Sequence, residues 1–158
     1  MMAGGYQGTY NTAVNRAAGR TLRRWRDTFS AIGSQGPTQK AMAAIGAQIV
    51  SSTIERMDEG VTPSGSAHKP LTPEYEARKR AQGYSADIWQ RTGESKRKVQ
   101  VIRATRKSVI VAINTPYSGW ANSDGRVPRP VIGMSSEDTK ATERILLRDF
   151  KQQLDRMT

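Results

Sequence analysis

The segment from Asn114 to Ser136 sets the strictest limit on how this chain of 158 residues can fold. It holds three of the seven prolines and one of the three tryptophans. Pro128 and Pro130 lack an amide donor and fix the backbone around Arg129 in an extended form, which continues neither a helix nor a central strand. We therefore expect a long loop that other parts of a structure hold in place.

Two large aromatic residues, Tyr117 and Trp120, lie in the same segment. Aromatic side chains in a loop of this kind anchor it either in the protein's own core or in a partner. We take Tyr117, Trp120 and the turn formed by Pro128, Arg129 and Pro130 as a candidate subunit or partner interface. The alternative is a loop that fills its own core.

The absence of cysteine and the single histidine limit the catalytic and metal-binding sites that the chain can form. The chain has no cysteine and one histidine, His68, so we expect no thiol nucleophile, no disulfide and no metal site. His68 falls in a proline-rich loop, where we expect it to be exposed. No apolar run is long enough to span a membrane, and the first residues show no signal-peptide pattern, so we expect neither membrane insertion nor secretion.

Catalytic motifs do not appear either. The sequence has no Gly-rich phosphate loop, no dinucleotide fingerprint and no G-x-S-x-G element. Residues Ser95 to Lys98 match S-x-x-K, but four residues in a basic run match easily by chance and no companion motif is present. We expect no enzymatic activity, no catalytic residue and no cofactor.

The net charge of +11 comes from two separate regions. Residues 1–36 contribute +4 and residues 69–107 contribute +7, so a single basic tail does not explain it. An excess of this size favours polyanions or acidic protein surfaces as partners. The residues that we consider as possible contacts to DNA are Arg97, Lys98, Arg106 and Lys107.

A basic amphipathic helix is predicted over residues 11–32. Its apolar stripe includes Trp25 and Phe29, which we take as candidate partner contacts, the alternative being an ordinary surface helix. We assign residues 1–36 to this N-terminal extension and residues 37–158 to a folded domain.

Four further elements are predicted in that domain. A core helix runs from about Thr38 to Glu59 and stops at Gly60. Its apolar stripe consists of Ala43, Ala47, Val50, Ile54 and Met57, flanked by Met42, Ile45 and Ile49. A short helix follows, capped by Thr72 and extending to Gln82.

A period of two then indicates an antiparallel hairpin, with Val99, Val101 and Arg103 in its first strand, residues 109–113 in its second and a turn at 106–107. Ser135 or Ser136 caps a final helix. The fold class is therefore α+β, with long N-terminal helices and a C-terminal helix packed on a small antiparallel sheet and with long Pro/Gly-rich loops.

Six short motifs occur in a characteristic order. They are P-S-G-S-A-H-K-P-L at 63–71, Y-E-A-R-K-R-A-Q-G at 75–83, Thr92–Gly93, the strand pair, Tyr117, and P-R-P-V-I-G-M-S at 128–135. This order resembles that of the bacteriophage virion morphogenesis, or tail completion, proteins, over about residues 38–157. Two positions depart from the family pattern, with His68 in place of Trp and Glu94 in place of an apolar residue.

The resemblance implies a structural virion protein of a tailed bacteriophage, assembled in the host cytoplasm. Its expected role is tail completion, or head–tail joining, as part of the neck. Its expected partners are further copies of itself in a ring, for which six is one copy number to consider, other neck, connector and tail proteins, and packaged DNA in the channel. The alternative is a basic nucleic-acid-binding protein without enzymatic activity, which would bind duplex DNA with a strong salt dependence.

Overall fold

The computed structural model describes residues 23, 26–27, 30–31, 33–90, 92–116 and 127–157. The helix predicted over residues 11–32 falls largely outside this set, and its described residues are helical. The candidate interface residues Trp25, Phe29, Tyr117 and Trp120 also lie outside the described residues.

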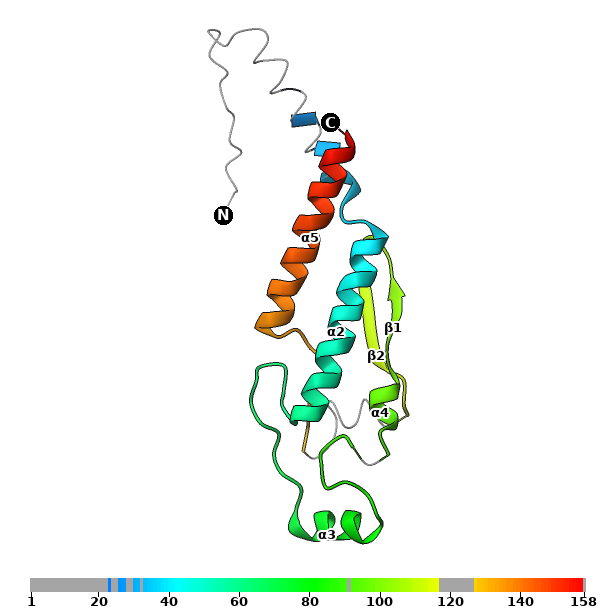
Figure 1. Ribbon diagram of the computed structural model, residues 1–158, viewed down its shortest axis with the longest axis vertical. Coiled ribbons are helices and arrows are strands. Elements are labelled where there is room, and N and C mark those ends of the chain that lie inside the picture. The colour runs from blue at the N-terminus through cyan, green and yellow to red at the C-terminus, as the bar shows by residue number, and fades with distance from the viewer. Residues whose placement is uncertain are drawn as a thin grey trace, which may run out of the picture.

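Helix α2, Gln39–Glu59, runs through the middle of the molecule (Figure 1). Its first turn is capped by Thr38, whose hydroxyl accepts a hydrogen bond from the Ala41 amide at 3.1 Å. It ends at Gly60, which takes the left-handed conformation at φ 67° and donates its amide to the Arg56 carbonyl. The predicted bounds of this helix are confirmed.

Two shorter helices follow α2. Helix α3 (Pro73–Ala81) lies beyond the C-terminal end of α2, and α4 (Glu94–Arg97) lies beside that end, at the base of the hairpin (Figure 1). Thr72 caps α3 as predicted, and its hydroxyl accepts a hydrogen bond from the Tyr75 amide at 3.4 Å. Helix α4 is a single turn that precedes the first strand and was not predicted, because one turn is too short to produce an amphipathic pattern.

The predicted hairpin is confirmed. Strand β1, Val99–Ala104, pairs antiparallel with β2, Val109–Ile113. The register shifts between Val101 and Arg103, so that Ile102 is an extra residue in β1. The alternation predicted through Arg103 therefore ends at Val101, and both Ile102 and Arg103 are exposed.

Helix α5, Ser136–Met157, packs along the side of α2 that the hairpin leaves uncovered (Figure 1). Helix α2 thus lies between α5 and the two-stranded sheet, and the α+β class predicted from the sequence is confirmed. None of the described helices is long and apolar enough to cross a membrane.

The core centres on four buried residues from three parts of the chain, namely Met57, Val99, Ile113 and Val131. Helix α2 packs closely on the sheet at Gly46, where a Cβ would lie 2.8 Å from the side chains of Val101 and Val109. The apolar stripe predicted for α2 is confirmed in the second half of the helix, where Met57 is buried and Val50 and Ile54 pack against the core, but it is displaced in the first half. Ala43 and Ala47 are exposed, and the buried face is centred on their neighbours Ile45 and Ile49.

Candidate assembly surfaces

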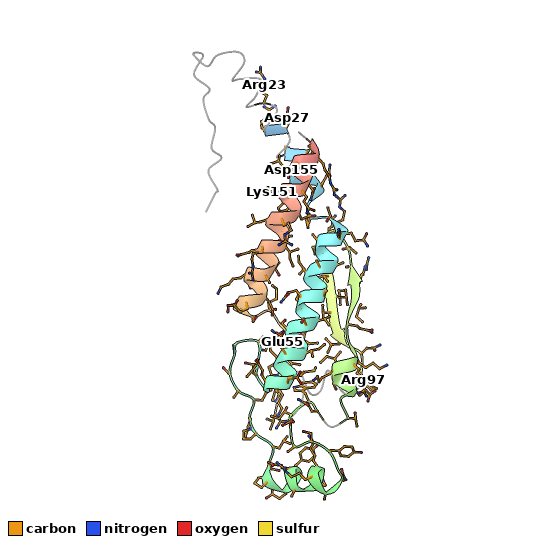
Figure 2. The ribbon with its side chains drawn as sticks, in the orientation of Figure 1. Arg23, Asp27, Glu55, Arg97, Lys151 and Asp155 are labelled. Atoms are coloured by element: carbon orange, nitrogen blue, oxygen red, sulfur yellow. The ribbon has the colours of Figure 1, made fainter. Side chains whose placement is uncertain are left out.

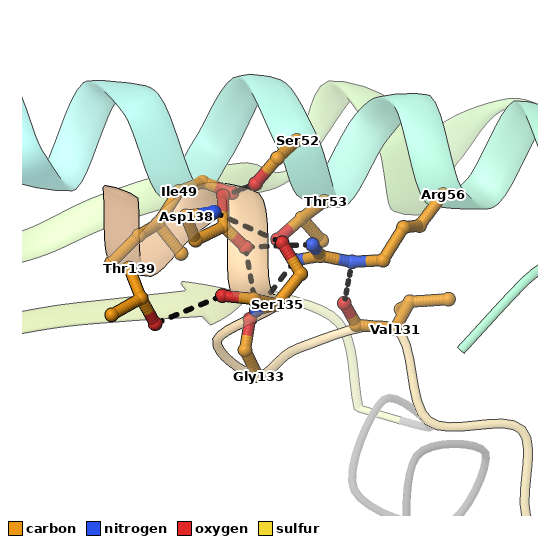
Figure 3. A network of polar contacts seen from close by, with 9 residues as sticks. All are labelled: Ile49, Ser52, Thr53, Arg56, Val131, Gly133, Ser135, Asp138 and Thr139. Atoms are coloured by element: carbon orange, nitrogen blue, oxygen red, sulfur yellow. Dashed lines mark hydrogen bonds and ion pairs between the residues drawn. The ribbon is translucent and has the colours of Figure 1, made fainter. Parts of the chain in front are cut away.

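Arg56 joins three segments at the C-terminal end of α2 (Figure 3). Its guanidinium donates to the Asp138 carboxylate at 2.8 Å, to the Val131 carbonyl at 2.9 Å and to the Gly133 carbonyl at 3.0 Å. A fourth hydrogen bond, 3.2 Å long, reaches the Thr53 hydroxyl in the preceding turn. The guanidinium group binds the backbone carbonyls of Val131 and Gly133 at the same time, so Arg56 holds the loop before α5 against α2.

Asp138 also closes the first turn of α5. Its carboxylate accepts from the Ser135 amide at 3.0 Å, while its own amide donates to the Ser135 hydroxyl at the same distance, which is a capping box. Burial opposes the ionisation of Asp138, but hydrogen bonds from Ser52, Ser135 and Arg56 outweigh it and lower the pKa of this carboxyl. The carboxylate is therefore charged, and its Oδ2 atom accepts hydrogen bonds from both the Arg56 guanidinium and the Ser135 amide.

The opposite end of α5 is tied to the start of α2 by a second carboxylate. Asp149 accepts hydrogen bonds from the amide and the hydroxyl of Thr38, at 2.9 and 2.6 Å. Gln153 donates to Asp149 at 2.9 Å and to the Gly36 carbonyl at 3.3 Å. Burial again opposes ionisation, and these hydrogen bonds again prevail and lower the pKa of Asp149. Both ends of α5 are thus fixed by buried polar contacts.

Motif loops that are far apart in the sequence meet at the C-terminal end of α2. Gly133 lies against Pro63, since a Cβ on Gly133 would come within 2.8 Å of the proline ring. Arg129 donates to the carbonyls of Lys69 and Pro70 at 3.2 and 3.4 Å. The P-x-G and R-P-x-x-G elements of the resemblance therefore form one contact within a single chain.

Trp89 completes this contact. Its indole nitrogen donates to the Arg129 carbonyl at 3.1 Å, and its ring packs against the core. Its backbone has φ 65°, which is unusual for a bulky residue and costs about 1–3 kcal/mol. Surrounding contacts must compensate for this strain.

The structure corrects the prediction for His68. It is buried, with 7% of its surface exposed, because the loop folds back so that its amide donates to the Gly60 carbonyl at 2.8 Å. Its pKa is lowered, first by burial and then by the positive charge of Arg129. Residues 61–73 have no apolar periodicity that could have indicated the burial of His68.

The candidate interface residues of the proline turn differ in exposure. Pro128 is exposed, whereas Arg129 and Pro130 are half-buried against their own chain. Val131, which follows directly, is fully buried. This part of the segment is therefore integrated into the protein's own core, and Pro128 is the member of the turn that remains open to a partner.

The four candidate DNA contacts do not form one patch. Arg97 lies on α4 at one end of the hairpin (Figure 2), followed by Lys98, while Arg106 and Lys107 form the turn at the other end. All four are exposed. Arg97 donates to the Thr92 carbonyl at 3.2 Å, and the other three side chains have no ion pair within the described part of the chain.

Potential metal ligands do not gather in the described residues. The polar contacts of Arg56, Asp138 and Asp149 hold elements of the same chain together. The hairpin turn carries two exposed positive charges, Arg106 and Lys107, that have no ion pair among the described residues. Such an arrangement suits assembly with other macromolecules.

Comparison with known proteins decides the family. The model of the phage virion morphogenesis family matches residues 12–151. The chain belongs to this family. The match begins well before the motifs described above and includes much of the basic N-terminal segment, which the motif resemblance left outside. No curated protein and no solved structure matches the chain. The protein is therefore a phage morphogenesis protein associated with the virion.

Proposed function

We propose that this virion morphogenesis protein completes the tail and joins it to the head as a structural component of the neck. The observation that carries the proposal is the family match over residues 12–151, which covers both the N-terminal segment and the folded domain. The role requires no catalysis, and we propose that the protein is not an enzyme.

Two features of the structure support a structural role. The motif residues make contacts within the chain, with Gly133 against Pro63 and Arg129 on the carbonyls of Lys69 and Pro70, and these contacts stabilise the fold. The hairpin, in contrast, carries the exposed side chains of Arg103, Arg106 and Lys107, and among the described elements it packs on α2. Ile102 and Ile110 on that hairpin are 52% and 48% exposed, which is typical of a surface that is covered on assembly.

We further propose that copies of the chain form a ring around the channel through which DNA passes. A contact that uses different surfaces on the two partners generates a ring when the rotation between copies closes. The excess of positive charge would lie next to acidic neck, connector or tail proteins, or next to packaged DNA. Weak, sequence-independent contact would let DNA slide past.

A deletion of the gene in its phage tests this proposal. We expect lysates with filled heads and separate tails, visible by electron microscopy, and joining restored by the wild-type protein supplied in trans. Normal joined particles from the deletion phage would contradict the proposal. Tight, salt-sensitive binding of the purified protein to duplex DNA, with no defect in joining, would support the alternative of a nucleic-acid-binding protein.

A further inference from the structure

A concavity of about 310 Å³ opens at the C-terminal end of α2, between the loop after Gly60 and the segment after α3. Four carboxylates line it and no lysine or arginine does, although the whole chain has a charge of +11. The lining acids are Asp58, Glu59, Glu76 and Asp87. An acidic lining of this kind favours a positively charged partner.

Some of these carboxylates form ion pairs with basic residues of the same chain. Asp58 pairs with Lys96, and Glu76 pairs with Arg80 at 2.8 Å. Glu59 has no ion pair or hydrogen bond within the described residues. The buried ring of His68 lines the same concavity, and its Nε2 atom has no hydrogen-bond partner there either. The site therefore retains both unpaired negative charge and an unused polar atom.

The matching group lies on the hairpin turn. Arg106 and Lys107 are adjacent, exposed and without an ion pair in the described part of the chain. The turn itself is firmly shaped, because the Thr105 hydroxyl accepts from the amides of Lys107 and Ser108 at 3.3 and 3.1 Å. The side chains of Arg106 and Lys107 therefore extend from an ordered turn, and little backbone entropy is lost when the turn binds a partner.

One chain cannot bring these two surfaces together. The hairpin turn lies beside the start of α2 (Figure 1), where Gln39 donates to the Ala104 carbonyl at 3.2 Å. The concavity is lined instead by Met57, Asp58 and Glu59 at the end of α2. Helix α2 has 21 residues, so the two surfaces are about 30 Å apart along its axis. The occupant must be another molecule.

We propose that the Arg106–Lys107 turn of one copy docks in the carboxylate-lined concavity of the next copy. The contact joins two different surfaces, so repeating it generates the head-to-tail arrangement from which rings are built. This inference rests on the ring in the proposed function and assigns its subunit contact. The association should weaken as ionic strength rises, because the Debye length falls from about 10 Å at 0.1 M to about 3 Å at 1 M.

Charge exchange tests the docking on the full-length protein by analytical ultracentrifugation. We expect the wild type to assemble, and Arg106→Glu/Lys107→Glu and Glu59→Lys/Asp87→Lys each to weaken self-association at least about tenfold. Mixing the two variants should restore association, since each supplies one reversed surface. The matched control, Lys98→Glu/Arg103→Glu, changes the charge equally on the same hairpin and should assemble like the wild type.

The outcomes separate this contact from the function. If the Arg106→Glu/Lys107→Glu variant assembled like the wild type, the docking proposal would be wrong, whatever its effect on DNA binding. A ring would then have to form through another surface. Loss of assembly in both variants without recovery in the mixture would also overturn it, given that circular dichroism shows both to be folded. Failure of the proposed function appears instead as joined particles in the gene-deletion phage.

Discussion

Arg56 and Asp138 form an ion pair of 2.8 Å whose side chains are 7% and 1% exposed, and it joins the last turn of α2 to the first turn of α5. Removing one member of such a pair leaves a buried charge without its partner. We expect Asp138→Asn to lower the free energy of unfolding by about 3–5 kcal/mol, measured by urea denaturation. The control is Glu137→Gln, an exposed neighbour paired with Lys140, which should change stability little. Equal effects of the two changes would contradict the structural role assigned to Asp138.

Acid should destabilise the fold through the two buried carboxylates. The folded-state pKa values of Asp138 and Asp149 are lowered, so the folded protein binds fewer protons than the unfolded chain. Their contribution is present above the unfolded pKa and is lost as pH falls through the folded values, that is, below about pH 4. Unfolding measured from pH 6 to 2 should show this loss, and Asp149→Asn should reduce its size. A slope unchanged in that variant would contradict the contacts of Asp149.

The burial of His68 predicts a separate change in stability at higher pH. The pKa of His68 in the folded protein is lowered by burial and by Arg129. As the pH falls, His68 is therefore protonated in the unfolded chain before it is protonated in the folded protein. Stability should therefore fall as pH drops below about 6.5, until the folded pKa is passed. His68→Phe should remove the decline between pH 7.5 and 5.5 while keeping the acid loss below pH 4. A decline that persists in this variant would show that another group titrates there.

Gly46 tests the close packing of α2 on the hairpin. In an open position, Gly→Ala within a helix stabilises by about 1 kcal/mol. At Gly46 the new Cβ would meet Val101 and Val109, and overpacking of this kind costs about 1–3 kcal/mol. We expect Gly46→Ala to leave the protein no more stable than the wild type and up to about 2 kcal/mol less stable. Ala47→Gly, on the exposed face, measures the propensity term alone. A gain in stability for Gly46→Ala would contradict the packing.

The proline turn separates packing from assembly. Val131 is fully buried, so Val131→Ala should destabilise by about 1–3 kcal/mol. Pro128 is exposed, so Pro128→Ala should leave the melting temperature nearly unchanged, and a defect in particle incorporation would then identify it as a partner contact. Incorporation at the wild-type level would remove Pro128 from the candidate interface.

Much of the fold could be predicted because local signals define its elements. Thr38 and Gly60 bound α2, Thr72 and Pro73 start α3, and the Ser135 box starts α5. These signals act within one helical turn, so they survive whatever the tertiary surroundings are.

The missed features depend on contacts between distant residues. Arg56 lies in the last turn of a helix among acidic residues, where a solvated side chain is the ordinary case, and its buried role requires Asp138 and the 131–133 carbonyls. His68 is buried by a loop that folds back, and no periodic pattern encodes this. In the first half of α2, the exposure of Ala43 and Ala47 accompanies the approach of the sheet at Gly46, which the apolar stripe alone does not indicate.

The most direct test of the proposed role is the position of the protein in the particle. Cryo-electron microscopy of the phage, with a tag fused to the protein and compared with untagged particles, should show the additional density as a closed ring between head and tail. Density along the tail tube or at its tip, or within the head shell, would contradict a role in head–tail joining.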